Sequence, residues 1–217
     1  MNLIPNLWVI NEQQDSHEFF NHLIDSSMDN QFKTQVHELV ECKSLVCISR
    51  QISSRFEQHT ILSLALENTN APQSIEYNLS KHCLPELLSE YQCDGSGPIG
   101  CNQFCCYISQ SITLSSNYLI IHLKTYDNTQ RKPDNLHIIV DGHLQVNQES
   151  FDLLGIIYHQ GQTMNCGHYF AELCYNNSWY QANDSKVKPI SRPTAPNPSI
   201  TPYILLYKKH PMFLTYL

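Results

Sequence analysis

Three side chains near the C-terminal end of the sequence have the types and spacing for acid–base chemistry: His168, Asn183 and Asp184. A histidine whose one ring nitrogen is held by an amide or a carboxylate can accept a proton from a nucleophile through its other nitrogen. Gly167 stands directly before His168 and permits close approach of the backbone at this point. The pattern is that of the base in a hydrolase.

A hairpin is expected to bring these residues together. Two strand-like runs flank Asn176-Asn177, which is good chemistry for a two-residue turn. With this turn, His168 and Asn183 become diagonal neighbours on one face of the hairpin, about 7 to 8 Å apart. A slip of one residue would turn Asp184 toward the histidine instead. The register therefore favours Asn183 as the partner and leaves Asp184 as the alternative.

Size and composition indicate one globular domain. The chain has 217 residues, 41% of them hydrophobic and 15% charged, and its formal charge is -7 without a basic stripe. Nucleic acid is therefore an unfavoured partner. The N-terminus does not read as a signal peptide, and no apolar run approaches the ~20 residues that span a bilayer. An odd number of cysteines, nine, fits a reducing compartment, the cytoplasm or nucleus, and no membrane partner is expected.

The elements around the hairpin predict an α+β fold. One helix is expected at residues 12–28, with Asn11 as its N-cap and an apolar stripe on one face, and a second helix at 79–88. Strands are expected at 44–52, 59–66, 107–114, 118–124, 153–159, 169–175, 179–183 and 203–208. A proline-rich loop at 191–199 precedes the last strand and cannot join a ladder.

Three segments, in order along the chain, resemble landmarks of the ubiquitin-specific proteases. Residues 13–20 read Gln-Gln-Asp-Ser-His-Glu-Phe-Phe and are similar to a helix of that family. Residues 118–124, Tyr-Leu-Ile-Ile-His-Leu-Lys, resemble its central palm strand. Residues 167–169 (Gly-His-Tyr), 179–185 (Trp-Tyr-Gln-Ala-Asn-Asp-Ser) and 203–208 (Tyr-Ile-Leu-Leu-Tyr-Lys) together resemble its histidine box.

This resemblance implies a papain-like cysteine peptidase with fingers, palm and thumb that hydrolyses the bond after the C-terminal glycine of ubiquitin. It assigns residues 1–30 to a thumb helix, 31–116 to the fingers and a connecting segment, and 117–210 to the palm with the histidine box. Most of the thumb would then be missing from this chain. Ubiquitin or a ubiquitinated protein is the implied partner.

The resemblance also assigns roles to single residues. His168 matches the general base, Asn183 matches the third catalytic position, and Asp184 would be its polar neighbour. Asp15 and Glu18 match positions that contact the basic tail of ubiquitin. Carboxylates three residues apart share one helix face and could pair with arginines, which is compatible with that role.

The nucleophilic cysteine of the family lies at a helix start upstream of the Gln-Gln-Asp segment, where the helix N-terminus lowers the thiol pKa. Here twelve residues precede Gln13 and none is cysteine. Cys166 is near His168 in sequence, but no opposing helix start would activate it. We therefore expect the chain as given to be inactive. The alternatives are a non-catalytic ubiquitin-binding module or scaffold, and a domain too incomplete to fold stably.

A second departure concerns metal. Many members of the family carry two Cys-x-x-Cys pairs in the fingers, whereas here Leu45 and Ser96 stand at the second positions. Four cysteines at wider spacing are weak candidates for a zinc site, with buried free thiols as the alternative reading. These candidates are Cys42, Cys47, Cys93 and Cys101.

Overall fold

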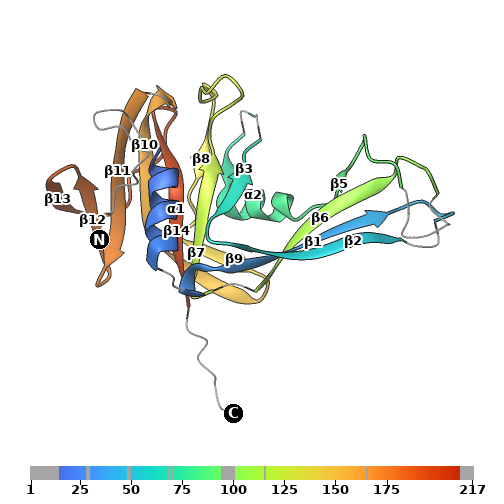
Figure 1. Cartoon of the computed structure of the whole chain (residues 1–217). Helices are drawn as coiled ribbons and strands as arrows, with labels where there is room; N and C mark the ends of the chain where they lie inside the picture. Colours follow the sequence, from blue (N-terminus) through green and yellow to red (C-terminus); the bar gives the residue numbers. More distant parts are fainter. Residues whose placement is uncertain are drawn as a thin grey trace, which may run out of the picture.

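The computed structural model describes residues 15–27, 30–47, 50–67, 69, 71–93, 101–114, 116–164 and 166–210. A broad main sheet carries a long arm of strands that projects to one side (Figure 1). The helices are α1 (Ser16–Ser27), the 3-10 helix η1 (Asn30–Phe32) and α2 (Ile75–His82). The strands are β1 (Thr34–Cys42), β2 (Gln51–His59), β3 (Leu62–Ala65), β4 (Gln73–Ser74), β5 (Glu86–Leu87), β6 (Cys106–Leu114), β7 (Tyr118–Lys124), β8 (Ile138–Ile139), β9 (His143–Val146), β10 (Glu149–Thr163), β11 (Cys166–Tyr175), β12 (Ser178–Asn183), β13 (Lys186–Ile190) and β14 (Ile200–Lys209).

The main sheet has eight strands in the order β13-β12-β11-β10-β14-β7-β3, with β9 paired to β10. All neighbouring pairs are antiparallel except β3 and β7, which run parallel. Strands β10 to β13 are consecutive in the chain and adjacent in the sheet. The last strand, β14, lies between β10 and β7, so the sheet interleaves distant parts of the sequence.

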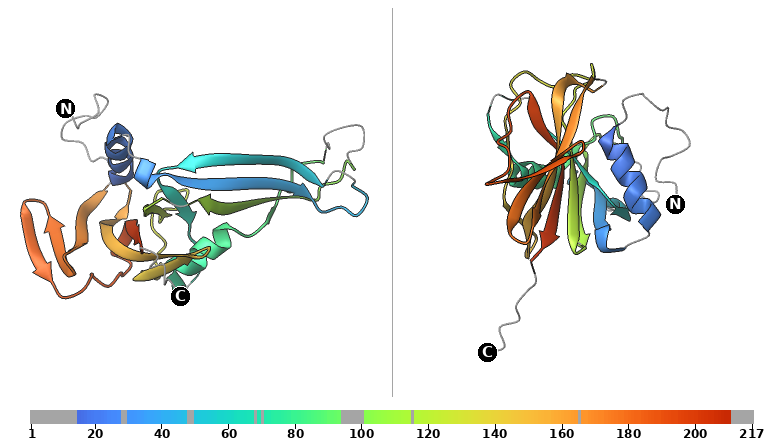
Figure 2. Two further views of the ribbon diagram at one scale, coloured as in Figure 1. Left: turned by 90° about the horizontal axis from the view of Figure 1, so that it is seen from below. Right: turned by 90° about the vertical axis from the view of Figure 1, so that its left-hand side faces the viewer.

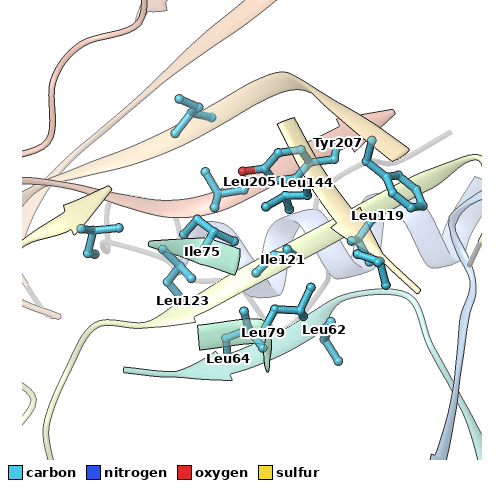
Figure 3. Close-up of a cluster of buried hydrophobic side chains, with 14 of the residues drawn as sticks. Leu62, Leu64, Ile75, Leu79, Leu119, Ile121, Leu123, Leu144, Leu205 and Tyr207 are labelled. Carbon is cyan, nitrogen blue, oxygen red and sulfur yellow. The ribbon is translucent and has the colours of Figure 1, made fainter. Parts of the chain in front are cut away.

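Strand β7 is buried on both faces, which explains its near-continuous apolar sequence. Leu119, Ile121 and Leu123 point to the face covered by α2, where they pack in the largest hydrophobic cluster (Figure 3). Ile120, between them, belongs to a second cluster with Ile24 of α1. The two helices therefore cover opposite faces of the sheet, and Figure 2 shows α1 lying along one of them.

The arm is a four-stranded sheet in the order β2-β1-β6-β5. Its central strand β1 alternates buried and partly exposed residues along its whole length, as a half-buried strand does. The expectation of a strand at 44–52 was wrong. Residues 45–46 form a turn at the tip of the arm, where Leu45 is 93% exposed, and β2 begins only at Gln51.

Both helices differ in their bounds from the expected ranges. Within the described residues α1 begins at Ser16, and Asp15 precedes it, while Asn11 and residues 12–14 lie outside the described part. Helix α2 covers Ile75–His82 instead of 79–88, because the side chain of Ser74 caps its start by accepting from the Tyr77 backbone N–H. Among the described residues no helix is long and apolar enough to cross a membrane.

The proline-rich loop is tied to the hairpin by a fully buried carboxylate, Glu172 on β11. Glu172 accepts hydrogen bonds from the Thr194 backbone N–H at 2.7 Å, the Thr194 hydroxyl at 2.5 Å and the Gln181 side-chain amide at 2.8 Å. The Tyr158 hydroxyl donates to the Thr194 carbonyl at 2.7 Å. These bonds fix the loop against the sheet without any ladder of its own.

Candidate active site

The hairpin has the register that its sequence predicts. Tyr175 pairs with Ser178 across the Asn176-Asn177 turn, and the pairing continues regularly to Ala171 and Ala182. Both asparagines adopt positive φ, 48° and 60°, which a tight turn between twisted strands requires. Beyond this last pair, β11 leads back to His168 and β12 leads on to Asn183.

His168 and Asn183 meet at the end of this hairpin. The imidazole Nε2 of His168 lies 2.6 Å from the side-chain Oδ1 of Asn183. Because an amide oxygen can only accept, Nε2 carries the proton and donates it. Nδ1 is then left as the basic nitrogen, and within the described residues no hydrogen-bond partner occupies it. The geometry is that of a base held in one tautomer and ready to take a proton.

The other two candidates near the base lie apart from this bond. Asp184 is exposed in the turn between β12 and β13 and has a positive φ of 50°. Within the described residues Asp184 makes no hydrogen bond to His168. Cys166 is exposed at the start of β11, where it pairs with Thr163. Of the predicted residues, only Asn183 is joined to His168.

An aromatic floor lies beneath the hairpin. His159 on β10 pairs with Tyr169 in the ladder, and its ring also faces Tyr126 and Tyr203. Burial, together with the charges of Lys132 and His168, lowers the pKa of His159 to about 4. This ring is therefore neutral at physiological pH.

Helix α1 begins beside this floor. Asp15 caps α1, since its Oδ1 accepts from the His17 backbone N–H at 2.7 Å, and its Oδ2 accepts from the Tyr203 hydroxyl at 2.8 Å. Glu18 is exposed one turn on. His17 stacks on His122 of β7 with ring centroids 4.1 Å apart. Asp15 and Glu18 thus both lie at the end of α1 nearest the hairpin. The Asp15 carboxylate is already hydrogen-bonded, whereas that of Glu18 faces solvent.

The four cysteines named as weak metal candidates come together at the tip of the arm, with all four Sγ atoms within 4.8 Å of one another. Sγ of Cys42 lies 3.5 Å from that of Cys101, and Sγ of Cys47 lies 3.7 Å from that of Cys93. Tetrahedral zinc with Zn–S bonds of about 2.3 Å requires S···S edges of roughly 3.8 Å. The thiol set therefore fits a zinc ion, despite its unusual spacing in the sequence.

Burial supports the same interpretation of the thiol cluster. Cys42 and Cys93 are fully buried and Cys47 is nearly so, as the ligands of a structural zinc site commonly are. A coordinating thiol binds zinc as the thiolate, so zinc binding at this cluster would release protons. Cys105 lies close to Cys42 at 3.4 Å between sulfurs but is not part of the four-sulfur group.

Sequence reasoning missed the residues under the base. His159 lies 33 positions from Tyr126 and 27 positions from Lys132, and no spacing rule relates it to them. The bond between Asp15 and Tyr203 was missed for the same reason, because it joins the first and last described elements. A single signal was present: Gly167 before the histidine indicates that something packs closely there.

The fold and this site define a class of protein, and comparison with known proteins agrees. The chain belongs to the ubiquitin carboxyl-terminal hydrolase family, whose model matches residues 4–207. Ubiquitin carboxyl-terminal hydrolase A of Dictyostelium discoideum is 37% identical over 59 residues, which are 27% of this chain and 7% of that protein.

Solved structures share the architecture. A SAGA Ubp8/Sgf11/Sus1/Sgf73 deubiquitinating module bound to ubiquitin aldehyde matches with a TM-score of 0.73 at 20% identity, over 92% of this chain and 50% of that chain. A yeast SAGA module with an Sgf73 mutant matches with a TM-score of 0.68 at 19% identity, over 92% and 46%. The expected fold of a ubiquitin-specific protease is confirmed, and the chain spans about half the length of these structures.

Proposed function

We propose that this domain supplies the base half of a cysteine-type deubiquitinase, with His168 as the general base and Asn183 as its orienting partner. The bond between His168 Nε2 and Asn183 Oδ1 carries this proposal. It leaves Nδ1 free to take the proton of a thiol and later to return a proton to the leaving amine. Membership of the ubiquitin carboxyl-terminal hydrolase family supports a ubiquitin C-terminal bond as the target.

The nucleophile in this proposal comes from a cysteine-bearing segment outside these 217 residues. No cysteine precedes Cys42 in the sequence, and six of the nine cysteines lie on or beside the arm. Such a segment would have to present a thiol at a helix start facing Nδ1 of His168. The chain alone is therefore proposed to be inactive.

Ubiquitin is the proposed partner, and two observations support it. Related modules have been solved in ubiquitin-bound form. Glu18 is exposed at the start of α1, beside the hairpin, and can pair with a basic peptide tail. The engaged carboxylate of Asp15 makes Glu18 the stronger candidate for this contact. All nine cysteines are unpaired thiols, which supports location in a reducing compartment, the cytoplasm or the nucleus.

The transcript upstream of Met1 provides the test. An in-frame cysteine segment, expressed together with this chain, should react with a ubiquitin-based covalent probe. The reaction should vanish in His168→Ala and persist in His143→Ala, which alters an exposed histidine paired with Asp152 on β10.

Experiments on the 217-residue chain alone distinguish the remaining hypotheses. It should bind ubiquitin in a calorimetric titration and show no turnover of a fluorogenic ubiquitin substrate. Binding without any upstream cysteine segment would favour a non-catalytic ubiquitin-binding module instead. Turnover by the chain alone, abolished by His168→Ala, would contradict the proposal and make Cys166 the first suspect. Absence of ubiquitin binding, both in the chain alone and in the chain with an upstream cysteine segment, would contradict the deubiquitinase proposal and the ubiquitin-binding module alike.

A further inference from the structure

His159 occupies the space directly beside the backbone that leads into His168. Its side chain is fully buried. A Cβ placed on Gly167 would lie 2.2 Å from the Nε2 atom of His159, far inside contact distance. The histidine ring therefore fills the volume that any other residue at 167 would need. Gly167 is required by this contact, and the ring in turn limits where the Gly167 backbone can move.

Tyr126 fixes the other edge of the His159 ring. The Tyr126 hydroxyl lies 2.8 Å from His159 Nδ1, while Nε2 of His159 has no hydrogen-bond partner in the part of the chain that is described. A buried polar atom without a partner is destabilising. The ring is thus held at Nδ1 and presents its other side as a packing surface to Gly167.

Lys132 holds the backbone of the same residue. Its ammonium group donates to the His159 carbonyl at 2.9 Å, and its side chain is almost completely buried. Within the described ranges no carboxylate forms an ion pair with Lys132. Burial lowers its pKa to about 8. An unpaired buried ammonium is costly to a fold, so its presence here needs a reason other than stability.

The segment around Lys132 also clasps the chain between His159 and His168. The Lys132 N–H donates to the Gln162 carbonyl at 3.0 Å, and the Gln162 side-chain amide donates back to the Lys132 carbonyl at 2.8 Å. The Met164 N–H donates to the Gln130 carbonyl at 3.0 Å. These bonds form a clasp, residues 130–132 against 162–164, at the approach to the base.

We propose that His159 is a positioning residue for His168, with Lys132 and Tyr126 holding it in place. The inference rests on the base role proposed above for His168. The His159 ring sets the position of Gly167, and Gly167 sets the origin of the His168 side chain and hence its bond to Asn183. A neutral ring is suited to this place, since a second positive charge would oppose the proton that His168 must accept.

The test measures the His168 Nε2–H proton by NMR in this chain, without ubiquitin or a nucleophile. When bonded to Asn183 the proton exchanges slowly with water and is visible. His159→Ala removes the ring and should speed exchange by about tenfold or more. His159→Phe keeps a ring against Gly167 and should preserve the signal. His143→Ala, an exposed histidine outside the clasp, should leave it unchanged.

Lys132→Met separates positioning from stability. Methionine fills similar space without an unpaired charge, so the thermal midpoint should stay level or rise. Exchange of the His168 Nε2–H should nevertheless become several times faster, because the His159 carbonyl is released. A residue that served stability alone would move both quantities together or neither.

Two results would overturn the inference. One is a folded His159→Ala variant whose His168 Nε2–H remains as protected as in the parent chain. If that variant does not fold, an unchanged exchange rate in Lys132→Met has the same force. Absence of ubiquitin binding by the parent chain, or of probe reactivity in the chain expressed with an upstream cysteine segment, would instead count against the proposed function and leave the positioning result intact.

Discussion

Asp15 and Tyr203 lie 188 positions apart in the chain and are joined by a 2.8 Å hydrogen bond. Asp15 also caps α1, so one carboxylate connects the helix to the central strand β14. Tyr203 is almost fully buried, and burial followed by the carboxylate of Asp15 raises the pKa of its hydroxyl. This carboxylate therefore fixes the start of α1 against the sheet that carries the hairpin.

Tyr203→Phe should weaken this connection. It removes the donor to a carboxylate, and hydrogen bonds to charged groups contribute about 1.5 to 3 kcal/mol. Urea unfolding should show a loss in that range. Tyr175→Phe, at a residue that is 64% exposed, should change stability by no more than about 0.5 kcal/mol. Equal effects of the two variants would contradict the assigned bond.

Only a residue that can accept a hydrogen bond from His168 Nε2 should be able to replace Asn183. Asn183→Asp keeps an oxygen near His168 Nε2, so the ring proton should stay protected from exchange. Asn183→Ala removes the acceptor, and the NMR signal of that proton should broaden or vanish at neutral pH. Asp184→Ala should have no effect, because Asp184 lies in the exposed turn. Loss of the signal in Asp184→Ala would show that the alternative register operates in solution.

The arm should bind one zinc ion per chain. Metal analysis after purification without added chelator should give about one equivalent, and cobalt substitution should give the absorption of a tetrahedral tetrathiolate. Cys93→Ser removes a buried ligand and should abolish stoichiometric binding. Cys174→Ser, on β11 and remote from the arm, is the matched control. Metal-free protein with all thiols intact would support buried free cysteines.

Lowering the pH should destabilise the protein already at pH values well above those at which carboxylates titrate. Burial, with contributions from His17 and Lys124, lowers the pKa of His122 to about 3, and that of His159 is lowered to about 4. Below about pH 6.5 the unfolded chain binds protons that the folded chain refuses, so stability falls as pH falls. The slope is about 1.4 kcal/mol per pH unit for each such histidine.

Urea midpoints measured between pH 7 and pH 5 would show this slope. His122→Gln should make this slope shallower, since one histidine with a burial-lowered pKa is gone, while His17, His82 and His159, whose pKa values burial also lowers, keep the rest of it. His143→Gln, at an exposed site, should leave it unchanged. A stability that is constant across this window would contradict the burial of the two neutral rings.

Glu172→Ala should be among the most damaging single changes. It leaves the Thr194 N–H and the Gln181 amide without their acceptor, at a cost of about 2 to 4 kcal/mol in thermal or urea unfolding. Val187→Ala, on the exposed strand β13, should cost no more than about 0.5 kcal/mol. Tolerance of Glu172→Ala would show that the loop is held by other contacts.

The hairpin and strand β7 were predictable because their information is local. Asn176-Asn177 determines a register by turn chemistry alone, and the dense apolar run at 118–124 has few alternatives to a buried strand. Strand β1 was missed because its buried face includes Thr34 and Glu38, which masks the alternation. The range of α2 could have been improved, since Pro85 within the expected helix opposes continuation.

The floor beneath the base could not be predicted in the same way. His159 contacts Gly167 through space that only the folded sheet defines, and Lys132 reaches His159 from a separate loop. No periodicity or spacing relates these residues. The thiol cluster is intermediate, because the four cysteines were recognisable as candidates while their convergence depends on the pairing of β1 with β6.

The place of β14 in the sheet determines when the domain can form during synthesis. Strands β7 and β10 each leave one edge unpaired until residues 200–209 have left the ribosome, since β14 alone joins them. Until then both carry apolar residues beside open backbone groups, which is the condition for misassociation between nascent chains. Completion of the main sheet is therefore a late event in synthesis of this chain, although the arm and the β10–β13 ladders do not include β14.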